Sequence, residues 1–281
     1  MTLAIGFIGY GEVGQLFARE LTARGCDVFV YDILFETGRG AAMRGIARPN
    51  GVTPCASLAD LCSAASLVIA AVTADAALAA ARDAAGMLTP RHTYIDLNSV
   101  SPQTKRDIAA VTETSGAAFV EFAVMGPVAE PKLAVQILAG GRDAAEVAAR
   151  LNLLGMRITA LGEEIGTASA TKLCRSIVIK GMEALMVDFS LAAPKAGVME
   201  AVIETLDETY PGMDWAGIAR AMPQRVARHG IRRAAEMREA AAMIRELGFD
   251  GSLAEAIAAR HETFARENRE ETQSRQRARS A

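Results

Sequence analysis

The chain has 281 residues, of which 51% are hydrophobic, so it can bury a full core in one large domain or two. Its net charge of -3 gives no basic footprint for nucleic acid. The longest uncharged run, residues 61–74, is shorter than the roughly 20 residues of a membrane-spanning helix. Four scattered cysteines and three isolated histidines form no zinc pattern, so we expect a soluble cytoplasmic protein with reduced thiols and no metal.

Short apolar runs alternate with helix-like stretches in the first part of the chain. Alanine-rich stretches of helical pattern, such as residues 13–24 and 74–85, separate most of these runs. Unbroken apolar strands that alternate with helices predict a parallel sheet covered on both faces. The expected strands are residues 4–8, 28–31, 67–72, 93–97, 118–122 and 135–138.

The second part of the chain carries only helical patterns. A long helix is predicted over residues 168–193, closed by Pro194, and at 1.5 Å per residue it would span about 40 Å. Helical patterns continue to about residue 266, with Pro211 and Pro223 as breaks and Gly248 as a helix stop. The polar tail, residues 267–281, has no periodicity and is expected to be disordered.

A glycine-rich turn follows the first predicted strand. The stretch Gly9-Tyr10-Gly11-Glu12-Val13-Gly14 matches G-x-G-x-x-G, and the second strand ends at Asp32, 23 residues after Gly9. The first glycine permits a tight turn, Gly11 lets the backbone approach a pyrophosphate, and Gly14 lets helix and strand pack closely. The phosphates would lie at the helix N-terminus. The sequence therefore predicts a Rossmann-type dinucleotide site made by this turn and Asp32.

Asp32 favours NAD over NADP. Its carboxylate would accept hydrogen bonds from the ribose hydroxyls, and its charge would repel a 2′-phosphate. Arg39 could still reach a phosphate, so NADP stays the less favoured cofactor. The plain alternative is that the glycines only make a sharp turn and that Asp32 is a surface residue.

These features together predict an α/β fold class with an N-terminal Rossmann-type parallel-sheet domain, a long interdomain helix and an all-α C-terminal domain. The expected boundaries are 1–165 for the dinucleotide-binding domain, 166–266 for the connecting helix with a helical substrate and dimerisation domain, and 267–281 for the tail. Such a helical half would leave a large apolar face uncovered, so we expect a homodimer.

Ligands of open α/β sheets bind at the carboxyl ends of the strands. Val72 ends the third predicted strand and Thr73 follows it, and both are expected to contact the cofactor. Asn98 and Ser99 follow the next strand, where Asn98 would contact cofactor and substrate and Ser99 the substrate.

Two turns lie at the same strand ends. The Gly126-Pro127 turn could offer backbone groups to a substrate. Ser101-Pro102 predicts a helix start, with the serine as N-cap and the proline in the first turn.

The long helix carries polar residues on one stripe. Lys172, Ser176, Lys180 and Glu183 recur at intervals of four, four and three. On an otherwise apolar helix such groups face water, one another or a ligand. The plain alternative is an exposed strip of solvated pairs. A lysine in a cleft can donate and accept protons, because desolvation and a neighbouring cation lower its pKa.

Four stretches in order carry a family resemblance. They are GFIGYGEVG at the start, DLNSVSP at 96–102, EFAVMGP at 121–127 and GEEIGTASATKLCRS at 162–176. The sequence resembles the β-hydroxyacid dehydrogenases, the superfamily of 3-hydroxyisobutyrate dehydrogenase and 6-phosphogluconate dehydrogenase. The resemblance implies that Lys172 is the general acid/base, that Asn98 and Ser99 hold the substrate carboxylate, and that Gly126 and Ser176 contact substrate.

The chain also departs from the pattern of that family. Met125-Gly126-Pro127 stands where the family has Ser-Gly-Gly, Ser176 replaces an asparagine, and Ala168 replaces a glycine. Ala235-Glu236 stands in place of a lysine-aspartate pair. These departures indicate a divergent branch with its own C-terminal domain.

The residues and the resemblance together predict an NAD-dependent oxidoreductase that interconverts a hydroxyl and a carbonyl on a small or medium hydroxyacid. Lys172 would move the proton. Lys180 would either depress the pKa of Lys172 or bind a substrate carboxylate. The alternatives are an imine reductase on the same scaffold and a non-catalytic NAD-binding sensor.

Overall fold

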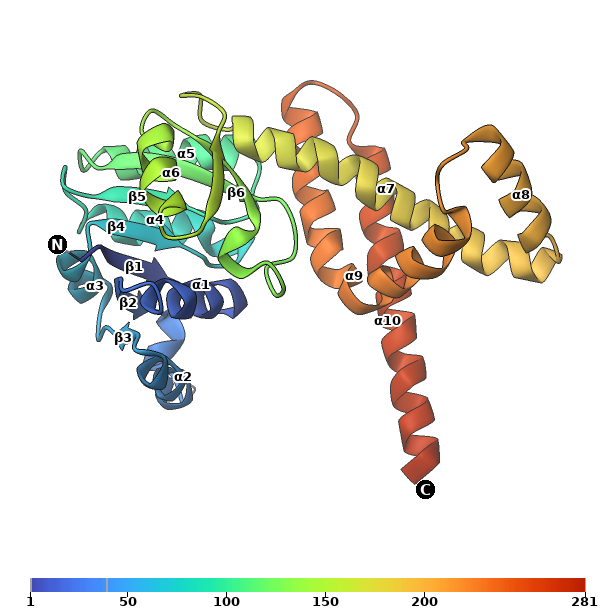
Figure 1. The fold of residues 1–281 in the computed structure, drawn as a ribbon, viewed down its shortest axis with the longest axis horizontal. Helices are drawn as coiled ribbons and strands as arrows, with labels where there is room; N and C mark the ends of the chain where they lie inside the picture. The colour runs from blue at the N-terminus through green and yellow to red at the C-terminus, as the bar shows by residue number, and fades with distance from the viewer. Residues whose placement is uncertain (1, 39, 281) are drawn as a thin grey trace. The chain divides into compact units, whose positions relative to one another are not determined.

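The computed structural model describes the backbone of residues 2–38 and 40–280, and side chains as far as residue 274. Arg39, the candidate phosphate contact, lies outside the described residues. The chain divides into two compact units, Met1–Lys172 and Leu173–Ala281 (Figure 1). Each unit is described by itself below.

The first unit is built on one sheet, which has eight strands among the described residues. The strand order is β3-β2-β1-β4-β5-β6-β7-β8. The chain winds outward in one direction from β1 to β2 and β3, and in the other direction from β4 onward, so β1 and β4 flank a topological switch point. The strands are β1 (Ala4–Ile8), β2 (Asp27–Tyr31), β3 (Thr53–Pro54), β4 (Leu67–Ala70), β5 (Thr93–Asp96), β6 (Ala118–Val124), β7 (Gln136–Gly140) and β8 (Arg157–Ala160).

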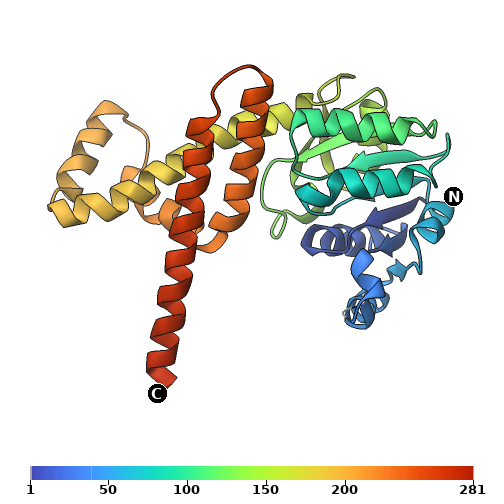
Figure 2. The same ribbon diagram turned by 180° about the vertical axis from the view of Figure 1, so that it is seen from behind.

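Helices cover both faces of the sheet, as the sequence predicted. α1 (Glu12–Thr22) and α6 (Ala144–Asn152) pack on one face (Figure 1), and α3 (Leu58–Ala64), α4 (Ala77–Ala85) and α5 (Pro102–Glu113) pack on the other (Figure 2). Side chains of one strand therefore alternate between two cores: Ile95 of β5 joins the first core, and Tyr94 joins the second. A further helix, α2 (Gly40–Ala47), follows β2.

All six predicted strands are present, but the prediction of a wholly parallel sheet is wrong for β7. This strand runs antiparallel to β6 and parallel to β8. Residues 125–135, which connect β6 to β7, contain only the short 3-10 turn Lys132–Ala134. A parallel return needs a crossover of a dozen or more residues, usually with a helix, so this connection forces the strand to turn back. The sequence reading also missed β3 and β8, which are two and four residues long.

The second unit contains only helices among its described residues. α7 (Thr167–Ala196) begins in the first unit and continues into the second, where α8 (Met199–Thr209), α9 (Trp215–Glu246) and α10 (Ser252–Ser280) follow. α9 and α10 lie side by side (Figures 1 and 2). Gly230 of α9 makes this possible, because a Cβ there would lie 2.3 Å from the carbonyl oxygen of His261.

Two predicted helix breaks are confirmed and two are wrong. Pro211 separates α8 from α9, and Gly248, with a φ of +84°, follows the end of α9. In contrast, α7 continues past Pro194 to Ala196, and Pro223 lies inside α9 and is buried. A proline costs a helix one hydrogen bond and a steric clash. The packing of a long helix outweighs that local cost here.

The expected disorder of the tail is a further point of difference. α10 extends to Ser280, so residues 267–280 are helical. The sequence has no glycine or proline after Gly251 that would end the helix. Contacts at i, i+4 spacing support it, including the Arg266–Glu262 ion pair and the bond from the Asn268 amide to the carbonyl of Phe264. Across the described part of the chain, no helix has the length and apolar character that a bilayer crossing requires.

Candidate active site

The glycine turn leaves β1 in a conformation that only glycine fits. Gly9 has a φ of +95°, and a Cβ there would lie 2.4 Å from the carbonyl oxygen of Ala71. A Cβ on Gly14 would lie 2.3 Å from the carbonyl oxygen of Gly9, so strand and helix pack in close contact. A Cβ on Gly11 would meet nothing within 4 Å. The turn is thus tight on its protein side and open at Gly11, where a pyrophosphate would approach.

Asp32 ties the glycine turn to the end of β2. Its Oδ2 accepts the backbone N–H of Tyr10 at 2.7 Å, and its Oδ1 accepts that of Leu34 at 2.9 Å. Each carboxylate oxygen keeps a second lone pair that a ribose hydroxyl can use. The side chain of Tyr10 is buried in the core, so only its backbone belongs to the turn.

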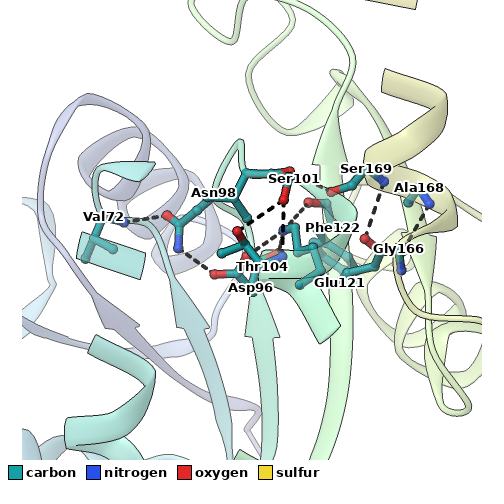
Figure 3. Close-up of polar contacts among 12 residues, drawn as sticks. Val72, Asp96, Asn98, Ser101, Thr104, Glu121, Phe122, Gly166, Ala168 and Ser169 are labelled. Atoms are coloured by element: carbon teal, nitrogen blue, oxygen red, sulfur yellow. Dashed lines mark hydrogen bonds and ion pairs between the residues drawn. The ribbon is translucent and has the colours of Figure 1, made fainter. Parts of the chain in front are cut away.

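Val72 and Asn98 connect the ends of β4 and β5. The Oδ1 of Asn98 accepts the N–H of Val72 at 2.8 Å, and its Nδ2 donates to Asp96 (Figure 3). Asn98 is buried, so its amide is held from both sides and offers a ligand at most one further N–H. Val72 also lies against the glycine turn, because a Cβ on Gly9 would be 2.9 Å from its Cγ1. Thr73 follows at the same strand end, before a 3-10 turn. The structure therefore brings the predicted cofactor residues of these strands together.

A buried ion pair lies beneath Asn98, and the sequence reading did not identify it. Lys105 of α5 is fully buried, and its Nζ lies 2.5 Å from Oδ2 of Asp96. The same ammonium donates to the carbonyl oxygens of Asp96 and Phe122, at 2.8 and 3.2 Å. These bonds satisfy the buried charge, and they fix the carboxylate that orients Asn98.

Ser99 and Ser101 play different parts in the loop after β5. The buried Oγ of Ser99 has no hydrogen-bond partner among the described residues. A buried hydroxyl without a partner calls for an explanation, and a bound ligand supplies one. Ser101 is the N-cap of α5, accepting the N–H of Thr104 at 3.2 Å, and Pro102 opens the helix, so the predicted cap is confirmed.

Gly126 lies just beyond the end of β6. A Cβ added there would meet nothing within 4 Å, so its backbone is open to a ligand. The neighbouring Met125 donates its N–H to the carbonyl of Gln136 at 2.9 Å, which holds the turn against β7.

Glu121 of β6 binds the start of α7. Its carboxylate is fully buried and accepts three backbone N–H groups, from Gly166 at 2.7 Å, Ala168 at 3.0 Å and Ser169 at 3.3 Å (Figure 3). Lys172 follows in the second turn of the same helix and is partly exposed.

Ser176 and Lys180 belong to a buried polar cluster of the second unit. The Nζ of Lys180 donates to the Oγ of Ser176 at 2.9 Å and lies 2.6 Å from a carboxylate oxygen of Glu236, on α9. Lys180 is 6% exposed. For these two residues the plain alternative of a solvated strip is wrong, because both are themselves buried.

Two further residues complete this cluster. Arg233 of α9 donates to Glu183 at 2.6 Å, and burial raises the pKa of Glu183 while the guanidinium opposes that rise. The ring of His261, on α10, is fully buried and its Nε2 donates to the carbonyl of Lys180 at 3.0 Å. Burial lowers the pKa of His261 to about 4. The Nδ1 of His261 and the Oε1 of Glu183 have no partner among the described residues.

Three buried residues of the structure were not predicted from the sequence, and the sequence pattern indicates the burial of two of them. His261 falls on the apolar face of α10, in step with Ala254, Ala258 and Ala265, so its periodicity indicated burial. Glu121 interrupts an apolar strand, which marks a buried charge that needs a partner. Lys105 gave no such signal, since its helix has mixed composition.

The glycine turn and its neighbours fit a dinucleotide. Gly9 forms a cradle that a Cβ would fill, Gly11 is open, and Asp32 stands at the end of the neighbouring strand. Among the described residues, no group of three histidine, cysteine, aspartate or glutamate side chains could hold a metal.

Comparison with known protein families gives two matches. Residues 4–162 match the NAD binding domain of 6-phosphogluconate dehydrogenase. The chain belongs to this family of NAD-binding domains. Residues 193–264 match a domain of unknown function, DUF1932. The resemblance read from the four motifs is confirmed, including a C-terminal domain of its own type.

Solved structures similar to this chain cover almost all of it. A conserved hypothetical protein from Sinorhizobium meliloti 1021 is 39% identical, with a TM-score of 0.82, over 93% of this chain and 88% of that one. The conserved protein MTH1747 is 36% identical, with a TM-score of 0.78, over 95% and 99%. That protein is described as structurally similar to 3-hydroxyacid dehydrogenases.

Named enzymes are more distant. Mitochondrial 3-hydroxyisobutyrate dehydrogenase of Drosophila melanogaster is 28% identical over 180 residues, which are 62% of this chain and 53% of the enzyme. The match thus spans about half of that enzyme. A reductive aminase from Aspergillus terreus, solved with NADPH and ethyl levulinate, shares the fold at 20% identity and a TM-score of 0.57, over 95% of both chains.

Proposed function

We propose that the chain is an NAD-dependent oxidoreductase that interconverts a hydroxyl and a carbonyl on a small or medium hydroxyacid-type substrate. One observation carries the proposal. The helix that bears Lys172 is bonded to the loop that bears Ser99, because Ser169 Oγ donates to the carbonyl of Val100 at 3.1 Å. The Lys172 amine and the Ser99 hydroxyl thus stand on two directly connected segments, and the Ser99 hydroxyl has no hydrogen-bond partner among the described residues.

Lys172 is proposed as the catalytic acid/base. During oxidation its neutral amine takes the proton of the substrate hydroxyl, and during reduction its ammonium returns a proton to the carbonyl oxygen. The nicotinamide, when bound, accepts or supplies the hydride. The glycine turn from Gly9 to Gly14, with Asp32, Val72, Thr73 and Asn98, would hold that cofactor.

Substrate contacts are assigned to the open positions of the site. Ser99 supplies a hydroxyl and Gly126 a backbone group, while Asn98 has one N–H left. On α7, Ser176 is the proposed contact. Lys180 donates to its Oγ, so the serine's own proton is left to donate to a substrate oxygen. Because Glu236 already balances the charge of Lys180, we assign Lys180 to holding Ser176 rather than to binding a carboxylate itself.

NAD is the proposed cofactor and NADP the less favoured one. Asp32 receives two backbone N–H groups, which hold the carboxylate at the end of β2 where a 2′-phosphate would have to lie. Bringing a second anion there costs electrostatic energy.

A second candidate is imine reduction on the same scaffold. It is favoured by the loss of the hydroxyl at Met125 and of the asparagine at Ser176, two of the contacts that hold a carboxylate substrate in the resembling family. A non-catalytic NAD sensor is a third candidate, but the retention of Lys172 disfavours it.

The test is a substrate screen with the wild type and two lysine variants. Hydroxyacids and cyclic imines are assayed with NAD(H) and NADP(H), and cofactor affinity is measured by fluorescence titration. Lys172→Ala should lower kcat by at least about 100-fold, since general acid–base groups contribute about 10² to 10⁴. Its NAD Kd should stay within about twofold. Lys195→Ala, an exposed lysine of the same helix, is the matched control and should keep full activity.

The outcomes separate the candidates. Turnover of imines alone supports the second candidate. NAD binding without turnover of any substrate supports the sensor. An active Lys172→Ala variant would contradict the assigned acid/base even if a substrate is found.

We also propose a homodimer. Not one residue of α8 is buried, and α7 exposes Val178, Leu185 and Leu191. A second copy of the chain would cover these apolar side chains.

A further inference from the structure

We propose that Glu121 is the positioning residue of the site: its buried carboxylate fixes the rotation and height of α7 and thereby the place of Lys172. The inference rests on the proposed function and deepens it. Among the described residues, the hydrogen bonds of the Glu121 carboxylate come from backbone N–H groups at the start of α7, so it would act through the helix.

The contacts of Glu121 are unusual for a strand residue. A helix leaves its first N–H groups without partners inside the helix, and a side chain of that helix or its N-cap commonly satisfies them. In α7 the carboxylate of a different element does so. Oε1 accepts from Gly166 and Ala168, and Oε2 accepts from Ser169. The negative charge also faces the positive end of the helix dipole.

The surroundings leave room for this carboxylate and for little else. Gly140 stands opposite Glu121 in the β6–β7 ladder, and a Cβ there would lie 2.6 Å from Oε1. Gly166 has a φ of +103°, which lets the chain turn into the helix while presenting its N–H. Burying a carboxylate is expensive unless hydrogen bonds compensate it, so three N–H groups are the condition for placing it here.

This cap fixes where Lys172 points. Lys172 follows Ala168 by four residues and Ser169 by three, so it lies one turn further on the same side of the helix. Helical side chains lean back toward the N-terminus, so that of Lys172 leans toward the capped turn. A rotation of α7 by one residue would swing Lys172 by about 100°.

Ser169 supplies the second fixed point. Its N–H goes to Glu121 and its Oγ to the carbonyl of Val100, in the loop that carries Ser99. The first turn of α7 is therefore bound to β6 and to the substrate loop at once. Displacing a catalytic group by about 1 Å can cost about 10²-fold in rate, so such a fixed turn has catalytic value.

The first experiment compares Glu121→Gln with a structural control of the same unit. The glutamine keeps the shape, but its amide group turns one acceptor into a donor that faces an N–H. We expect kcat to fall at least about tenfold, with KM and the NAD Kd within about twofold. The control is Asn152→Ala, which removes two bonds to Ile158, at 2.8 and 2.9 Å, far along the chain from the proposed site. It should lower the melting temperature and leave kcat unchanged.

The second experiment does not depend on turnover. The chain has only five lysines, Lys105, Lys132, Lys172, Lys180 and Lys195. Their dimethylated, ¹³C-labelled forms give few NMR signals, and Lys172→Arg assigns the one of interest. In Glu121→Gln the Lys172 signal should change its chemical shift, because a helix that is no longer fixed at its first turn places the amine in a different environment. In Asn152→Ala it should not move.

The outcomes decide between positioning and plain stability. A loss of kcat beyond that of Asn152→Ala, or a moved Lys172 signal, supports the proposal. Wild-type kcat together with an unmoved Lys172 signal overturns it, and so does a loss no larger than the control's with an unmoved signal. If Glu121→Gln does not fold, Ser169→Ala removes only the bond to Val100 and is judged by the same two measurements. If the wild type turns over no substrate, the proposed function fails while the NMR result still decides the role of Glu121.

Discussion

The interior of the second unit strongly lowers the pKa of one side chain, His261. The ring is fully buried, and charged groups of two helices act on it: Lys180 on α7, and Arg233 and Glu236 on α9. Burial is the largest cause that lowers its pKa from 6.5 to about 4, and the two cations act in the same direction. The folded protein therefore keeps His261 neutral at pH values at which an unfolded chain would protonate it.

The stability of the protein should consequently fall as the pH drops from about 6.5 toward 4. In that window the unfolded state binds a proton that the folded state refuses, so the free energy of unfolding decreases by up to about 1.4 kcal/mol per pH unit. Above pH 6.5 the contribution is fully present. The measurement is urea unfolding of wild type and His261→Gln between pH 4.5 and 8. The variant should show a shallower decline, and equal slopes would contradict the argument.

Glu183 changes the free energy of unfolding in the opposite direction as the pH falls, and so partly offsets the effect of His261. Burial raises its pKa above the ordinary value, so the folded state takes up this proton more readily than the unfolded state. Glu183 therefore recovers stability as the pH falls through its raised pKa. Because the wild type and His261→Gln share Glu183, the comparison of their slopes cancels its contribution.

The sequence predicted the residues of the site that follow from local spacing, but not the partners that the fold brings to them. The glycine turn, Asp32 and the lysine stripe were predicted from local spacing, because strand, turn and helix N-terminus follow one another along the chain. The partners were not predictable in the same way. Lys105 meets Asp96 and Glu121 meets the start of α7 only after the sheet has formed, and neither distance is encoded in a short window.

At the scale of elements, the close packing of α9 on α10 depends on Gly230. A Cβ there would lie 2.3 Å from the carbonyl oxygen of His261 and 2.7 Å from the Cβ of Ala265. Backbone cannot move aside as a flexible side chain can, so the two helices would have to separate.

Gly230→Ala should therefore destabilise the second unit by about 1–3 kcal/mol, although alanine is the better helix former. Gly181 of α7 provides the matched control, since a Cβ there would meet only Ile257, at 3.5 Å. Gly181→Ala should be neutral or stabilising by up to about 1 kcal/mol. Circular dichroism melts compare the two variants. A stable Gly230→Ala protein would show that the helices can separate at little cost.

Elements were predicted well where hydrophobic period alone decides them. The six buried strands and the long helix follow from apolar runs and from spacing. The direction of β7 depends on the length of its connection, and the survival of Pro223 inside α9 depends on tertiary packing. Local sequence propensity predicts neither the direction of β7 nor the position of Pro223 inside a helix.

At the scale of the whole molecule, the exposed apolar side chains of the second unit lead to a prediction about assembly. Leu185 of α7 is 66% exposed although it lies in a long apolar helix. We expect sedimentation to give twice the chain mass of 29.6 kDa. Leu185→Lys should shift the protein toward the monomer, because a charge cannot be buried unpaired in an apolar interface.

A leucine of the first unit serves as the control for this substitution. Leu153 is 88% exposed, and Leu153→Lys should leave the mass unchanged. A wild type that sediments as a monomer at all concentrations would rule out the dimer. A mass that responds equally to both substitutions would place the interface elsewhere.

The bridge made by Asn98 has one more consequence. The amide of Asn98 accepts the backbone N–H of Val72 and donates to the carboxylate of Asp96. These two hydrogen bonds hold the loops after β4 and β5 together. A nucleotide that binds against the loop after β4 would therefore also restrain the loop after β5, which carries Ser99.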